Sequence, residues 1–186
     1  MVDNLPPLQK LIVLNLAKNK SQTINETVKA LSKSYKPTWT AFNSLEKKKL
    51  IIKSDTKNYR GQTYPRFWLT DQGMIIALIE GVSANILLQT TKKFYPDAEA
   101  AHIFLEMIPY FDSEIIKMAQ TYAKGKENLT FAEVAQVILS SAASGLEIEE
   151  AKKIVTILKR YPKHYAALKT IIEVMIKQLS YLIEDY

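Results

Sequence analysis

The chain has 186 residues, of which 47% are hydrophobic and 24% are charged, so it can form one globular domain or two small ones. Five glycines and seven prolines leave little material for disordered or collagen-like segments. The absence of cysteine excludes disulfides, thiolate nucleophiles and cysteine-based zinc sites, and it fits a reducing compartment.

The net charge of +6 is concentrated in the N-terminal part of the chain. Residues 1–80 contain 13 Lys/Arg and 6 Asp/Glu, whereas residues 81–186 contain 12 and 13. Within residues 29–66 the counts are 10 and 2. Such clustering indicates a polyanionic partner, and the alternative is an ordinary solvated lysine surface.

Three helices are predicted in the first fifty residues. The first follows Pro7 and contains LQKLIVLNLAK, and the second runs from an N-cap at Thr23 to about Ser34, with Glu26 completing a capping box. The third spans Pro37 to about Lys49, with Pro37 as its first helical residue. Two helices followed by a tight turn and another helix is the helix-turn-helix order.

A β-hairpin should follow, formed by LIIKSD and TYPRFWLT. The interval between the two strands is TKNYRGQT, where Gly61 can supply the positive φ that a turn requires. Strand alternation allows Trp68 to be partly exposed and to contact another domain. Thr70 then caps a further helix, with Asp71 near its positive end.

The third helix has two different sides. Phe42 and Leu45, with Ala41 and Thr38, form a stripe that should face the core. Lys36, Thr40, Asn43 and Lys47 lie on the opposite side. Trp39 lies about a quarter turn from the apolar stripe, and because indoles are usually buried we expect it to pack in the core rather than against a ligand.

The segment LEKKKLI, the basic hairpin and WLTDQG together resemble the winged-helix DNA-binding domains of MarR-type and PadR-type regulators, over about residues 8–80. The resemblance implies a recognition helix at Pro37–Lys49 and a wing at Thr56–Pro65. Lys49 departs from the pattern, since these families prefer glycine in a left-handed helix end, where lysine costs on the order of 1 kcal/mol.

The expected DNA contacts follow from these two elements. Thr40 and Asn43 would reach base edges or the sugar-phosphate backbone, and Lys36 and Lys47 would bind phosphates. From the wing, side chains would reach the minor groove or flanking phosphates: Lys57, Tyr59, Arg60 and Arg66. The alternatives are a solvated helix face on an interaction module and a wing charged only for solubility.

The rest of the chain is predicted to be helical. Residues 81–96 form a linker helix, from Ala84 to Phe94, and residues 97–186 a helical dimerisation or effector domain. Within it, Asp97 caps AEAAHIFLEMI, Pro109 interrupts that helix, and Thr130 and Glu133 form a capping box. Further helices are expected at Ser113–Tyr122, from Phe131 to Gly145, at Ile148–Arg160 and at His164–Ile183, with Gly125 ending the earlier pair. A ligand pocket among Tyr95, Phe104, Tyr110 and Phe111 is no better supported than a core made of the same aromatic residues.

Nothing indicates catalysis, a metal or a cofactor. His102 and His164 lie far apart in the sequence, and although Glu99 and Glu106 flank His102, these residues could bind a metal only if a partner helix supplied further ligands. No phosphate loop, GxSxG or HExxH motif is found. The segment MVDNLPPLQK does not resemble an export signal, and the most apolar stretch, residues 74–89, is shorter than the ~20 residues of a membrane span. We therefore expect a cytoplasmic protein, and its isoleucine and lysine content suits a prokaryote.

Together these features predict a mainly α protein, with an N-terminal winged helix of three helices plus a β-hairpin wing and a C-terminal all-α domain. The predicted function is sequence-specific binding of double-stranded DNA by a transcriptional regulator. A homodimer formed through the C-terminal helices would read a two-fold site, with an unknown effector as a further partner. The rival hypothesis is a winged-helix protein-protein interaction module within a larger assembly.

Overall fold

The computed structural model describes residues 5–111, 113–124, 126, 130–142 and 148–163, together with residues 166 and 173. The protein is mainly helical and contains a small two-stranded antiparallel sheet. The first half consists of α1 (Pro7–Lys18), α2 (Ile24–Leu31), α3 (Tyr35–Lys47), β1 (Ile51–Tyr59), β2 (Gln62–Leu69) and α4 (Asp71–Ile79). The second half contains α5 (Ala84–Phe94), α6 (Glu99–Met107), the 3-10 helix Ile108–Tyr110, α7 (Ser113–Lys124), α8 (Phe131–Ala142) and α9 (Ile148–Lys159).

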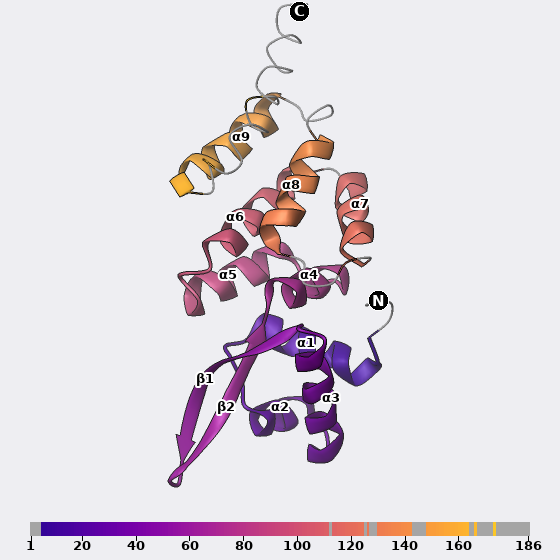
Figure 1. The fold of residues 1–186 in the computed structure, drawn as a ribbon, viewed down its shortest axis with the longest axis vertical. Helices are drawn as coiled ribbons and strands as arrows, with labels where there is room; N and C mark the ends of the chain where they lie inside the picture. Colours follow the sequence, from indigo (N-terminus) through magenta and orange to yellow (C-terminus); the bar gives the residue numbers. More distant parts are fainter. Residues whose placement is uncertain are drawn as a thin grey trace, which may run out of the picture.

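The elements are arranged along the long axis of the molecule. Figure 1 shows α1, α2, α3 and the β-hairpin at one end and α6, α7, α8 and α9 at the other, with α4 and α5 between them. The tip of the hairpin and the beginning of α3 both lie at the end farthest from α9. A surface built from these two elements is therefore separate from the C-terminal helices.

The predicted capping box of the second helix is present. The Glu26 amide donates to the Thr23 hydroxyl, and the Thr23 amide donates to the Glu26 carboxylate at 2.8 Å. The side chain of each residue thus accepts a hydrogen bond from the backbone amide of the other. The helix ends at Leu31, earlier than the predicted Ser34, because Ser32 adopts a left-handed conformation with φ 51°.

The third helix begins at Tyr35, two residues before the predicted start at Pro37. Proline is tolerated in this position because the first four amides of a helix have no intrahelical acceptor. At the other end, Lys49 has φ 56°, so this lysine adopts the left-handed conformation in spite of its cost, and the departure from glycine does not change the helix end. The Leu50 amide donates to the Leu45 carbonyl at 3.0 Å and the Lys49 amide to Glu46 at 2.9 Å, which closes the helix end although no glycine is present.

The hairpin is longer and tighter than predicted. Ile51 pairs with Leu69 at the base of the hairpin, and Tyr59 pairs with Gln62 next to the turn. Most of the expected eight-residue interval is therefore strand. Arg60 and Gly61 make the whole turn with φ 49° and 76°, which matches a two-residue type I′ turn. The positive φ predicted for Gly61 is confirmed, and Arg60 shares that conformation.

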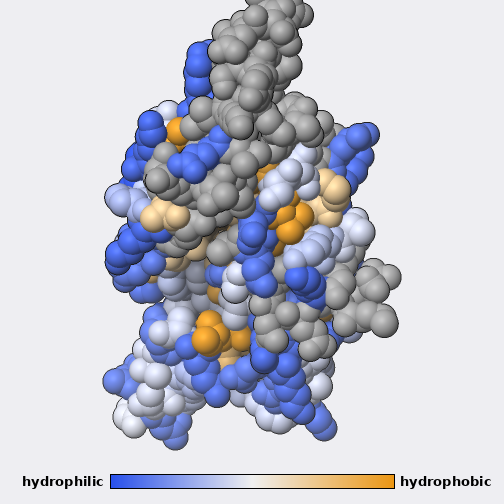
Figure 2. All heavy atoms as spheres, turned by 45° about the horizontal axis from the view of Figure 1, so that its top comes forward, coloured by the Kyte–Doolittle hydropathy of each residue, from blue (hydrophilic) through white to orange (hydrophobic). Residues whose placement is uncertain are grey.

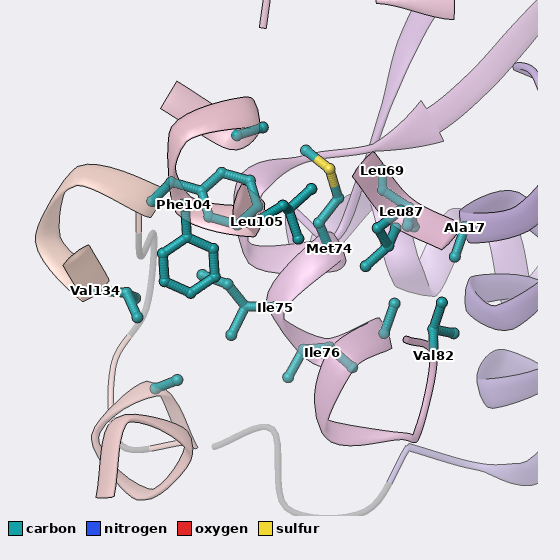
Figure 3. Close-up of a cluster of buried hydrophobic side chains, with 14 of the residues drawn as sticks. Ala17, Leu69, Met74, Ile75, Ile76, Val82, Leu87, Phe104, Leu105 and Val134 are labelled. Atoms are coloured by element: carbon teal, nitrogen blue, oxygen red, sulfur yellow. The ribbon is translucent and has the colours of Figure 1, made fainter. Parts of the chain in front are cut away.

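The buried side chains form a continuous cluster that extends from Leu5 to Leu158 among the described residues, and α4 lies at its centre. Figure 3 shows Met74 beside Leu69 and Leu105, and Ile75 beside Phe104. Six of the residues of α4 are buried, including Gln72 and Gly73, as expected for a helix that is apolar on all sides. The predicted Thr70 cap is confirmed, since its hydroxyl accepts from the Gly73 amide at 3.1 Å.

The C-terminal helices follow several sequence signals. The Thr130 amide donates to the Glu133 carboxylate at 2.9 Å, which confirms that capping box, and Pro109 lies in the 3-10 helix after α6. Asp97 does not cap α6, whose N-cap is Ala98. The predicted stops at Gly125 and Gly145 and the helix from His164 to Ile183 lie outside the described residues. No helix in the described part is long and apolar enough to cross a membrane.

His102 lies buried where α5 meets α6, with only 5% of its surface exposed. Its Nε2 has no hydrogen-bond partner among the described residues. Burial lowers the pKa of His102; a hydrogen bond with the Thr91 backbone and the charges of Glu106 and Glu99 oppose this change, while Lys92 reinforces it. The neutral imidazole is therefore the form that the folded protein accommodates.

We expect acid to destabilise the protein through this histidine. In the unfolded chain its pKa is near 6.5, and in the folded protein it is lower, so the stabilisation is fully present above pH 6.5. It should be lost as pH falls from 6.5 through the folded pKa, with a slope of at most about 1.4 kcal/mol per pH unit. Urea denaturation of wild type and His102→Gln between pH 7.5 and 5 tests this. A stability difference between the two proteins that does not change with pH would contradict it.

Candidate nucleic-acid interface

The exposed face of α3 carries the four predicted residues together. Lys36, Thr40 and Lys47 are exposed and Asn43 is half-buried, while Thr38, Ala41, Phe42 and Leu45 are buried on the opposite side. The spacing of the first set repeats the helical period, so these side chains line one face. The Thr40 hydroxyl donates to the Lys36 carbonyl at 3.1 Å, which leaves its oxygen able to accept a hydrogen bond.

The back of α3 is held firmly. Phe42 packs edge-on against Phe67 of β2, with ring centroids 5.2 Å apart. On the side toward α1, the Gln9 amide donates to the Ser44 hydroxyl at 3.0 Å, and Lys48 donates to the Gln9 side-chain oxygen at 3.1 Å. These contacts fix the rotation of the helix about its axis and hence the direction of the exposed face.

Trp39 is 48% exposed, so the prediction that it packs in the core is wrong. The buried positions of α3 are already filled by Thr38, Ala41 and Phe42, and Trp39 remains on the flank of the helix. Tyr35, one turn earlier, is 52% exposed on the same flank. Sequence reasoning did not consider Tyr35 as a site residue, although its spacing from Trp39 could have indicated it.

This aromatic flank, Tyr35 and Trp39, is on the side of α3 toward the hairpin. Glu46 lies two helical turns after Trp39 on the same side, and its carboxylate pairs with Lys53 of β1 at 3.3 Å. The aromatic side chains therefore lie on the side of α3 that faces β1 at its C-terminal end, rather than on the side of α1.

The hairpin tip presents Tyr59 and Arg60 to solvent. Tyr59 is more than half exposed, and the Arg60 guanidinium lies 5.3 Å from the centre of its ring. Lys57 is exposed but pairs with Glu26 of α2 at 2.7 Å. Although partial burial would raise the pKa of Glu26, its hydrogen bonds with Lys57 and Thr23 and the charge of Arg66 lower it overall.

Arg66 is not on the free side of the hairpin. Its side chain is only 18% exposed, and its Nε donates to the Ser21 carbonyl at 2.8 Å. Its guanidinium also lies 3.6 Å from the carboxylates of Glu26 and Asp55. The structure therefore places Arg66 between the hairpin and the segment joining α1 to α2, where the Gln22 and Phe67 backbones also pair.

Trp68 is 4% exposed, so the expectation that it is partly exposed is wrong, whereas it does contact the helical part. Its ring stacks on Tyr95, which follows α5, with centroids 3.5 Å apart, and its Nε1 donates to the Leu16 carbonyl at 3.0 Å. The Tyr95 hydroxyl accepts from the Ser21 amide at 2.9 Å. Tyr95 covers the second face of β2, which is why strand alternation does not expose the indole.

The suggested pocket of four aromatic residues is not formed. Tyr95 is at the hairpin, Phe104 packs against Phe131 with centroids 4.8 Å apart, and Tyr110 lies under Lys153. The described residues contain no cluster of three or more His, Asp or Glu side chains able to hold a metal ion.

On α3 and at the tip of the hairpin, three exposed cations have no carboxylate partner among the described residues: Lys36, Lys47 and Arg60. We call the exposed face of α3, its aromatic flank and the hairpin tip with Lys57, Tyr59 and Arg60 the α3–hairpin surface. Hydrophilic side chains cover most of the lower end of the molecule in Figure 2. Comparison of the chain with protein-family models, curated proteins and solved structures yields no match.

Proposed function

We propose that the protein is a winged-helix DNA-binding transcriptional regulator, with α3 as the recognition helix and the β-hairpin as the wing. The order of α1, α2, α3 and the hairpin supports this assignment, as does the burial of one face of α3 against the hairpin base. An exposed helix face fits the major groove, and a two-stranded ribbon beside it fits the neighbouring backbone or groove.

The observation that carries the proposal is the set of free cations on the α3–hairpin surface. Lys36, Lys47 and Arg60 come from two separate elements and have no neutralising carboxylate among the described residues. Elsewhere on the described surface, Lys10, Lys92 and Arg160 are paired with glutamates, whereas Lys117 and Lys159 are exposed and have no carboxylate partner among the described residues. What supports the proposal is therefore the gathering of free cations from two elements on one surface, and not the absence of pairing alone. A polyanion is the partner whose charge this arrangement complements.

Trp39 adds an apolar contact to the proposed interface. An indole that is half exposed on the flank of a recognition helix can lie against a deoxyribose or a thymine methyl group. Asn43 and Thr40 supply the polar groups that could distinguish bases on the same helix face.

The salt dependence of DNA affinity tests the proposal. We expect a 30-base-pair random-sequence duplex to bind at low salt, with log affinity falling linearly with log salt. The double variant Lys47→Ala, Arg60→Ala should bind more weakly and reduce that slope by about 2, since each lost phosphate contact contributes about 0.9. The measurement is fluorescence anisotropy of labelled duplex between 50 and 300 mM salt.

The matched control is Lys117→Ala, Lys159→Ala, which removes two exposed cations from α7 and α9. This control should keep the wild-type slope. Iodide quenching gives a second readout, because Trp39 is exposed and Trp68 is buried, so bound duplex should protect the quenchable tryptophan. Absence of binding at 50 mM salt, or equal slopes for the two double variants, would refute the assignment.

The proposal includes a homodimer formed through the C-terminal helices, because regulators that read two half-sites generally use two-fold symmetry. The two recognition helices would then lie ~34 Å apart, matching successive major grooves. Sedimentation at micromolar concentration should show a dimer with or without DNA, and a monomer in both conditions would contradict this part alone.

A protein-protein interaction module is the second candidate, and the exposed aromatic residues favour it. Tryptophan, tyrosine and arginine dominate the energy of protein interfaces, and Tyr35, Trp39, Tyr59 and Arg60 are all exposed on the α3–hairpin surface. The free lysines on the same surface favour DNA over this alternative. If the protein fails to bind DNA at low salt, the protein-protein interaction module becomes the better supported function.

A further inference from the structure

A cavity of about 180 Å³ lies in the helical part, outside the α3–hairpin surface. Its base is formed by buried side chains of four helices, among them Ile75 of α4, Phe104 of α6, Ala119 of α7 and Val134 of α8. Figure 3 shows Ile75, Phe104 and Val134 gathered around the same space from three of these helices. The cavity is thus enclosed by elements that are far apart in the sequence.

The lining of this cavity contains only aliphatic side chains and one phenylalanine. It offers neither a charged group nor a side-chain hydrogen-bond donor or acceptor, so a charged or strongly polar molecule would lose its hydration without compensation. Dry apolar cavities of about 150 Å³ are known to hold benzene. The volume and chemistry together define a small uncharged hydrophobic guest.

The cavity has a route to solvent. Leu78, Ala84 and Ile116 line it and are only half-buried, whereas Ile75, Phe104 and Ile138 are buried. The half-buried residues therefore form a rim open to solvent and the buried residues form the base of the cavity. A guest molecule can enter through the rim without global unfolding. A pure packing void would instead be surrounded by buried residues on all sides.

We propose that this cavity is a binding site for a small uncharged hydrophobic molecule of the size of a monocyclic aromatic hydrocarbon. The site is formed by α4, α6, α7 and α8, with Ala84 of α5 at its rim, and does not depend on whether the α3–hairpin surface binds DNA. Filling it replaces missing dispersion contacts of the lining side chains, which is the source of affinity in an apolar pocket.

Toluene is the test molecule, and benzoate, its charged counterpart of similar shape, is the control. At about ten times its dissociation constant, toluene should raise the Tm of the full chain by on the order of 3 °C in a saturable manner. Benzoate at the same concentration and neutral pH should leave the Tm unchanged. A wild-type Tm that does not respond to toluene, or that responds equally to benzoate, would show that the cavity is an empty void or that the effect is unspecific.

Two variants locate the site. Ala119→Leu fills the buried base and Ala84→Leu fills the half-buried rim, and each should abolish the toluene response. Ala30→Leu makes the same change at an exposed position of α2 and should keep the response. If Ala119→Leu does not fold, Ala84→Leu decides the question, because a rim position tolerates added volume. Retention of the full toluene response in the folded variants would overturn the assignment.

Methyl NMR of the wild type gives an independent readout. Toluene should shift the δ1-methyl resonances of Ile75 and Ile138, which line the cavity, and should leave that of Ile12 in the core of α1 unchanged. Shifts at Ile12 without shifts at Ile75 and Ile138 would place the guest elsewhere and contradict the proposal.

Discussion

Replacing Gly73 by alanine is expected to lower the free energy of unfolding by about 2 kcal/mol, although the same change in a helix is usually favourable. A Cβ atom at this position would lie 2.0 Å from the Leu50 carbonyl oxygen and 3.3 Å from the Leu69 Cβ. Both neighbours are backbone or near-backbone atoms that cannot rotate away. The gain of about 1 kcal/mol in helix propensity is therefore outweighed by the displacement of two packed segments.

The position of this clash gives it a functional consequence. Leu50 follows the end of α3 and also accepts a hydrogen bond from the Thr70 amide at 3.1 Å, so it joins α3 to the start of α4. Moving α4 away from Leu50 would tilt α3 against the hairpin. If the α3–hairpin surface binds DNA as proposed, Gly73→Ala should therefore weaken that binding as well as stability.

Urea denaturation measures the effect, and Gly81→Ala is the comparison for a glycine substitution without a clash. Gly81 has φ 94° and no atom within 4 Å of a built Cβ, so its substitution should cost only backbone strain, on the order of 1 kcal/mol. Gly73 has no positive φ, so a loss there comes from the clash with Leu50 and Leu69. A Gly73→Ala protein that is as stable as wild type would show that α3 and α4 can separate without cost.

Local signals in the sequence predicted several helix starts and the turn of the hairpin well. The capping residues Thr23, Thr70 and Thr130 act over three residues, and the apolar stripe of α3 depends only on helical spacing, so no tertiary information was needed. Gly61 was identified as a turn residue for the same reason. The length of the hairpin strands was underestimated because polar residues on an exposed two-stranded ribbon look like a loop.

The errors at the candidate site have a common physical cause, since burial of a flank residue depends on what another part of the chain places beside it. Trp39 remained exposed because nothing among the described residues covers that flank, whereas Trp68 became buried because Tyr95 stacks on it. Propensity and spacing contain no information about a partner that lies elsewhere in the chain. The same limit applies to Arg66, whose role depends on Ser21 and Glu26.

The hairpin is held from two directions by contacts that sequence reasoning could not combine. Arg66 connects it to the segment before α2, and Tyr95 connects Trp68 to the end of α5 while its hydroxyl accepts from Ser21. Asp71 similarly accepts from the Phe131 amide at 3.2 Å, and burial raises the pKa of this carboxyl group. The candidate wing is thus positioned jointly by the N-terminal helices and the helical part.

Replacing Arg66 by methionine should lower the free energy of unfolding by about 2 kcal/mol. Methionine retains the apolar stem, but the Ser21 carbonyl loses its charged donor and the carboxylates of Glu26 and Asp55 lose a nearby cation. Hydrogen bonds to charged groups contribute about 1.5–3 kcal/mol, and the side chain is sufficiently buried for little of this to be screened. Urea denaturation at neutral pH measures the loss.

Arg60→Met on the same hairpin is the matched comparison that separates anchoring from DNA contact. Arg60 is exposed at the turn without a carboxylate partner among the described residues, so its loss should change stability by less than about 0.5 kcal/mol. In DNA titrations Arg60→Met should reduce the salt slope by about 1, whereas Arg66→Met should weaken affinity with the slope unchanged. The opposite pattern, a shallower slope with full stability for Arg66→Met, would restore Arg66 to the DNA contacts that the sequence predicted. The stability and the slope together therefore assign each arginine to its role without requiring knowledge of the operator.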